Sequence, residues 1–187
     1  MGNPVKEGSL YIKISALLMF LALFLHFISM GAPDWAKANE DITNRKEHIG
    51  LWRYCVDTIG GGTACNAFVD IVVGDWIRAA QGFSILALFV MLGAVAVLII
   101  CVVNGDDDDP RMLMIGIILT GVAALFKLIE VATFACTYQE YFKNKDPGIW
   151  EDVGVLSWAF GVAVASLILN CATVVTLVLE MAQGSEK

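Results

Sequence analysis

The sequence has few charged residues and few histidines. Charged side chains make up 17% of its 187 residues, against about 25% in a typical soluble chain. Its two histidines are His26 and His48, and no nucleophile–base pair or cluster of metal ligands is visible, so we expect no enzyme, no small-molecule substrate, no metal and no cofactor. The net charge of −7 has the wrong sign for a nucleic-acid partner. No Asn-X-Ser/Thr sequence occurs, so no N-glycan is expected.

Apolar residues are abundant instead, at 58%, and they gather in long runs. A helix needs about 20 apolar residues to cross the hydrocarbon core of a bilayer. Four segments meet this requirement, at about residues 12–32, 79–103, 111–136 and 153–179. They predict a single membrane domain over residues 1–187, mainly α, in which a left-handed bundle of four transmembrane helices is surrounded by lipid.

The two longer loops are predicted at about residues 34–78 and 137–152. The larger one contains Gly60-Gly61-Gly62, flanked by apolar and β-branched residues at 49–59 and 68–73. This pattern predicts two strands that meet at a glycine turn, and therefore a small antiparallel sheet formed largely by this loop. Cys55 and Cys65 lie at mirror-related positions across the turn, so a cross-strand disulfide is sterically natural; the alternative is two unpaired thiols.

The disulfide also decides the expected orientation. Disulfides persist on the oxidising side of a membrane. We therefore expect the large loop to be extracellular and, because the number of spans is even, both termini to be cytoplasmic. The loops carry more Lys and Arg than the termini and the short turn, which by itself favours the opposite orientation.

A tryptophan motif precedes the cysteines. Trp35 is followed by Gly50-Leu51-Trp52, then by Cys55 and Cys65, and Arg78 stands just before the second span. Sixteen residues separate the tryptophans, two separate Trp52 from Cys55, and nine separate the cysteines. With four spans and a large first loop, this resembles the claudin superfamily of claudins, peripheral myelin and epithelial membrane proteins, and calcium-channel gamma subunits. The resemblance implies that the motif residues fix the extracellular sheet onto the bundle.

The resemblance implies two functions. In the first, the chain is a claudin-like protein of cell–cell junctions in the plasma membrane. Its sheet would meet other claudin-like molecules in the same and the opposing membrane, and would form or regulate a paracellular barrier or pore. The alternative is an auxiliary, gamma-like subunit that packs against an ion channel or receptor. We favour the first, because the sequence offers no specialised cytoplasmic segment.

Charged residues in the large loop suggest an ion path. In claudins that form pores, charged side chains on the sheet select ions by sign, so Asp57, Asp70 and Asp75 are candidate pore-lining residues. After Cys65 the charged residues before Arg78 are both acidic, which predicts a preference for cations. The alternative is that these carboxylates only solvate the sheet of a tight barrier.

Two charges interrupt the third predicted span. Lys127 and Glu130 are three residues apart and share a helical face. Intramembrane charges suggest a functional site by default. The simpler interpretation is an ion pair near the outer headgroups, with His26 of the first span hydrogen-bonded inside the bundle.

Overall fold

The computed structural model describes residues 10–40, 45–57, 61–68, 74–104, 110–145 and 154–184. In these residues four long helices alternate with short strands. The helices are α1 (Leu10–Gly31), α2 (Asp75–Asn104), α3 (Pro110–Lys145) and α4 (Trp158–Gly184). The strands are β1 (Ala36–Glu40), β2 (Arg45–Ile49), β3 (Arg53–Asp57), β4 (Thr63–Ala67) and β5 (Val155–Leu156).

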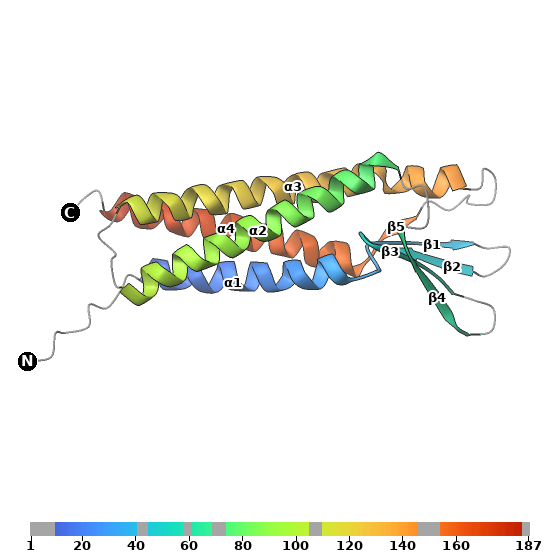
Figure 1. The fold of residues 1–187 in the computed structure, drawn as a ribbon, viewed down its shortest axis with the longest axis horizontal. Helices are drawn as coiled ribbons and strands as arrows, with labels where there is room; N and C mark the ends of the chain where they lie inside the picture. The colour runs from blue at the N-terminus through green and yellow to red at the C-terminus, as the bar shows by residue number, and fades with distance from the viewer. Residues whose placement is uncertain are drawn as a thin grey trace, which may run out of the picture.

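The four helices form one elongated bundle, and the sheet stands beyond one of its ends (Figure 1). All four are long and apolar enough to cross a membrane. Helix α1 packs mainly against α4, and α2 mainly against α3. Helix α1 begins and α4 ends at the end of the bundle opposite the sheet (Figure 1). The predicted fold class, a four-helix membrane bundle with a small antiparallel sheet, is therefore confirmed.

The sheet has five strands in the order β4-β3-β2-β1-β5, and each described pair is antiparallel. Four strands come from the first loop, and β5 precedes α4. The glycine turn lies between β3 and β4, where Gly61 has a φ of +83°, a conformation that favours glycine. The second strand of this hairpin lies at Thr63–Ala67, closer to the turn than the predicted 68–73, of which residues 69–73 lie outside the described part of the chain.

The second loop differs from the prediction, because α3 continues nine residues beyond 136. Tyr138 and Phe142, four positions apart on this extension, are almost fully buried in the core beside the sheet. No glycine or proline occurs between residue 136 and Pro147. The extension is therefore a helix that packing stabilises, although its sequence is too polar for a membrane span.

The fourth helix begins later than the predicted residue 153. Val155 and Leu156 pair with Lys37 and Ala36 of β1, so this segment adds a fifth strand to the sheet. The backbone N–H of Ser157 then donates to the Trp35 carbonyl at 2.8 Å. The chain passes from the sheet directly into α4, which helps to fix the sheet relative to the bundle.

Two apolar cores stabilise the molecule. One lies within the bundle, around Met19, Met91, Leu98 and Leu177. The other, which we call the junction core, joins the apolar face of the sheet to the adjacent helix ends. It includes Trp35, Ala36, Ile49, Leu51, Ile77, Phe134, Tyr138, Phe142 and Ala159.

Candidate functional site: the sheet and its attachment to the bundle

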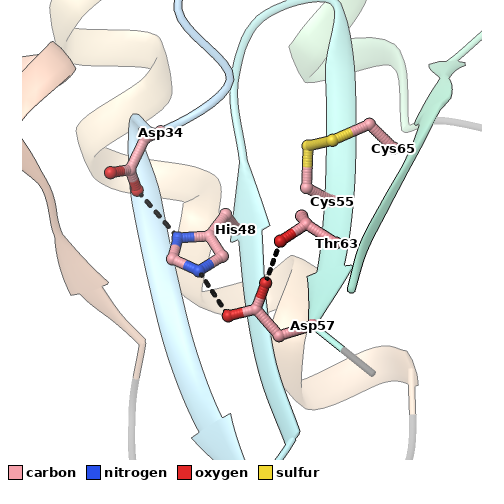
Figure 2. The surroundings of a disulfide bond; sticks show 6 residues. All are labelled: Asp34, His48, Cys55, Asp57, Thr63 and Cys65. Atoms are coloured by element: carbon pink, nitrogen blue, oxygen red, sulfur yellow. Dashed lines mark hydrogen bonds and ion pairs between the residues drawn. A yellow bond between two sulfur atoms is a disulfide. The ribbon is translucent and has the colours of Figure 1, made fainter. Parts of the chain in front are cut away.

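The predicted disulfide is present. Cys55 on β3 and Cys65 on β4 are directly opposed in the antiparallel register, and their Cα atoms are 4.1 Å apart. Figure 2 shows the bridge linking the two neighbouring strands. Strand β4 is exposed along its whole length and has no neighbour on its outer side among the described strands. The bridge is therefore the covalent contact that holds this edge strand to the sheet.

Trp35 connects the sheet to three parts of the structure. Its side chain is fully buried, 4.9 Å from the Phe134 ring of α3 and 6.0 Å from the Phe160 ring of α4, measured between centroids. Its indole N–H donates to the carbonyl of Ser29 in α1 at 2.7 Å. Its backbone N–H donates to the carbonyl of Ile49 in β2 at 2.7 Å. One residue thus joins three helices to the sheet.

Gly50 is required by a close approach of two backbones. A Cβ added at this position would lie 2.7 Å from the Cα of Pro33, and the Ala32 carbonyl is also in its way. The connection from α1 to β1 passes directly over this glycine. A side chain here would separate the connection from the sheet.

Leu51 and Trp52 complete the motif on the apolar side. Leu51 is fully buried in the junction core, and Trp52 packs against that core while partly exposed. The Leu51 carbonyl accepts a hydrogen bond from the Gln81 amide of α2 at 2.7 Å. The Trp52 carbonyl accepts one from the Phe68 backbone N–H at 3.1 Å. Arg78, by contrast, is exposed on the first turns of α2.

The two faces of the sheet differ in character. Ala36, Ala38 and Ile49 are buried on the face toward the junction core. Glu47 is buried on this face too, but the alternation of side chains and the strand register place most of the polar side chains on the other face. This polar face carries Lys37, Lys46, His48, Arg53, Asp57 and Thr63.

The three candidate pore residues are not equivalent. Asp57 lies on the polar face, at the end of β3. Asp75 is the first residue of α2 rather than part of a strand, a position where a carboxylate interacts favourably with the helix dipole. Asp70 lies outside the described residues. On the described strands this face carries more basic than acidic side chains, so the cation preference stays a prediction that rests mainly on Asp70.

His48, on this polar face, lies between two carboxylates, one in the connection from α1 to β1 and one at the end of β3. Its Nδ1 lies 3.1 Å from Asp34 Oδ1, and its Nε2 lies 3.6 Å from Asp57 Oδ2 (Figure 2). The Thr63 hydroxyl donates to Asp57 Oδ1 at 2.8 Å. This hydrogen bond is the main reason why the pKa of the Asp57 carboxyl is below its ordinary value. Nothing in the spacing of these residues along the sequence predicts this arrangement of charges across β2, β3 and β4.

A second polar cluster lies inside the bundle. Lys127 Nζ is 2.9 Å from Glu130 Oε2 and 3.0 Å from His26 Nδ1, and all three side chains are fully buried. His26 Nε2 lies 3.1 Å from the Ser84 carbonyl oxygen, which can only accept, so Nε2 donates and Nδ1 accepts from the ammonium group. The expected ion pair and the hydrogen-bonded histidine are both present. Together they connect α1, α2 and α3 inside the bundle, and the expected position near the outer headgroups stays a prediction.

Among the described residues, no three His, Cys, Asp or Glu side chains gather in a way that could hold a metal ion. The described part of the chain offers a sheet with one face attached to the bundle and one open, mostly polar face. A model of the PMP-22/EMP/MP20/Claudin family matches residues 9–176. A comparison with the curated proteins finds no match.

Proposed function

The chain belongs to the PMP-22/EMP/MP20/Claudin family, and we propose that it is a claudin-like adhesion protein of cell–cell contacts that forms or regulates a paracellular barrier or pore. The family is one of membrane proteins, and four helices of the chain are able to span a bilayer.

The observation that supports adhesion most strongly is how the sheet is mounted. It projects from one end of the bundle (Figure 1), and its apolar face is covered by the junction core. Trp35 and β5 attach it to α1, α3 and α4. A sheet held this firmly presents its open face and its free edge strand β4 in a fixed orientation, which reduces the entropy lost when a partner binds.

The disulfide supports an extracellular position for the sheet. A bridge between Cys55 and Cys65 persists in an oxidising compartment and is reduced in the cytosol. Because the chain enters α1 and leaves α4 at the opposite end of the bundle, this orientation places both termini in the cytoplasm. The partners in this proposal are lipid around the helices, and further copies or other claudin-like chains at the sheet.

A mixed culture tests adhesion against the alternative role as a channel or receptor subunit. Cells without junctional strands of their own are transfected with the chain carrying either a green or a red label, and then mixed. We expect both labels to concentrate where a green cell meets a red cell, and to stay uniform where a labelled cell meets an untransfected one. Uniform labels at every contact, with enrichment only after a channel subunit is co-expressed, would favour the auxiliary-subunit function.

Ion selectivity needs a separate measurement. If the chain forms a pore, the acidic residues after Cys65 predict a preference for cations, and Asp70→Asn reduces it. Dilution potentials for sodium chloride across a low-background epithelial monolayer measure the preference directly. A preference for chloride would contradict the prediction and would fit the basic side chains Lys37, Lys46 and Arg53 on the described polar face.

A further inference from the structure

The two nitrogens of the His48 ring point at two different carboxylates. Nδ1 lies 3.1 Å from Asp34, which precedes β1, and Nε2 lies 3.6 Å from Asp57 on β3 (Figure 2). The ring thus stands between groups that are 14 residues before it and nine residues after it in sequence. Its side chain is 24% exposed, so protons reach it from the solvent.

A neutral imidazole cannot satisfy both contacts. It carries one N–H, and its other nitrogen presents a lone pair, which a carboxylate oxygen repels. An imidazolium ring has two N–H groups and a positive charge, so it donates a hydrogen bond to Asp34 and at the same time forms an ion pair with Asp57. The observed geometry therefore matches the protonated ring.

The surrounding charges determine how far this effect extends. The groups that face the ring are Asp34 from the connection after α1, Lys37 opposite it on β1, and Asp57 on β3, with Lys46 and Arg53 one step away on the same face. Lys37, Lys46 and Arg53 are exposed, so solvent and salt screen their repulsion of a charged ring. The two carboxylates are the groups in direct contact.

We infer that His48 is a proton-operated clamp, which strengthens the sheet under mildly acid conditions by holding the α1–β1 connection to β2 and β3 at the same time. When the ring loses its proton, one of the two contacts becomes repulsive, and the sheet loosens along the line from Asp34 to Asp57. Asp57 stays ionised at mildly acid pH, because an aspartate carboxyl ordinarily ionises near about pH 4 and the Thr63 hydrogen bond lowers its pKa further. Imidazoles change charge between about pH 5 and 8. The stability of the sheet is therefore greatest at the acid end of this range and falls as the pH rises.

Hydrogen exchange of the full chain in lipid nanodiscs tests the clamp. Exchange of the β2 and β3 amides is measured at about pH 5.5 and pH 8 and corrected for the intrinsic effect of pH. We expect about two- to fivefold greater protection at the lower pH, the range for one partly exposed ion pair. His48→Gln, which keeps a donor and an acceptor but does not titrate, removes this difference. If the ratio of protection at pH 5.5 to protection at pH 8 is the same in the wild type and in His48→Gln, the inference is overturned.

Two further variants keep the test decisive if His48→Gln folds poorly. Asp57→Asn leaves the His48 ring in place but removes one of its anionic partners, so the pH difference shrinks. Lys37→Gln removes a solvent-screened charge that faces the ring but leaves both carboxylates of the clamp in place, so the difference persists. A difference that survives Asp57→Asn unchanged contradicts the clamp, as does a neutral His48 ring at pH 5.5 in a nitrogen-15 spectrum of histidine-labelled protein.

Discussion

Removing one partner of the buried ion pair between Lys127 and Glu130, which both lie on α3, tests how the bundle accommodates buried charge. Lys127→Met keeps the length and shape of the side chain while removing its charge. Glu130→Gln does the same for the acid. Both native side chains are fully buried, and Nζ lies 2.9 Å from Oε2. Either single variant therefore leaves one charge without its counter-ion inside the bundle.

The two single variants are expected to differ in cost. Breaking a buried pair from one side typically costs about 3–5 kcal/mol of unfolding free energy. Glu130→Gln lies near the lower end, because His26 Nδ1 and the new amide oxygen still accept from the ammonium group. Lys127→Met lies near the upper end, because it strands a carboxylate and also removes the donor to His26.

The double variant restores neutrality. We expect it to cost only about 1–2 kcal/mol, because a neutral methionine and a neutral amide leave no uncompensated buried charge. The double-mutant cycle formed by the wild type, the two single variants and the double variant then gives a coupling energy of several kcal/mol. Independent sites deviate from additivity by only about 0.5 kcal/mol. Unfolding by SDS in mixed micelles, followed through the five tryptophans, measures all four proteins. Leu128→Met, a change at a half-exposed neighbour on α3, is the control and should leave stability unchanged.

Additive costs would refute this reasoning. If the double variant loses as much stability as the two single variants together, the charges do not interact in the folded protein. A larger cost for Glu130→Gln than for Lys127→Met would refute the role given to His26 as the second acceptor.

The remaining predictions concern the sheet. Gly50→Ala should destabilise the protein by about 1–3 kcal/mol in thermal unfolding, because the new Cβ would collide with the backbone at Pro33, whereas Gly31→Ala, which meets no atom within 4 Å, should change stability by less than about 0.5 kcal/mol. Replacing Cys55 and Cys65 together by serine should lower the free energy of unfolding by roughly 2.5–3 kcal/mol, the chain-entropy estimate for a loop of this size, and should reduce delivery to the cell surface. Mass spectrometry of a non-reduced digest of the wild type should find the two peptides linked, and finding both thiols free would contradict the bridge. Thr63→Val should raise the pKa of Asp57 toward its ordinary value. The ionised Asp57 carboxyl contributes to the stability of the sheet above its ordinary pKa, and this contribution is lost as the pH falls through the lowered pKa of the folded protein. In Thr63→Val the loss should occur at a higher pH, and hydrogen exchange of β3 and β4 followed during an acid titration would detect it.

The bundle and the disulfide hairpin could be predicted because each leaves a pattern along the chain. Uncharged runs mark the spans, and two cysteines at mirror positions about a glycine turn mark the bridge. The start of α3 follows the same logic, since Pro110 is its first residue. These features depend on neighbours close in sequence, so the sequence displays them directly.

The rest depends on contacts between distant residues. The end of α3 is polar, and it stays helical because Tyr138 and Phe142 pack into the junction core. Strand β5 has two residues and exists through its pairing with Ala36 and Lys37. His48 meets Asp57 only because the register of β2 and β3 brings them together. None of these partners can be identified without knowing which strands are neighbours.

Aggregation of vesicles tests adhesion by the sheet most directly. The purified chain is reconstituted into liposomes, and the fraction with the sheet outward is measured by protease access to a tag at the C-terminus. We predict that light scattering rises when both vesicle populations carry outward sheets, and that reducing the Cys55–Cys65 bridge abolishes the rise. Vesicles that stay dispersed although their outward sheets are folded and oxidised would contradict the account.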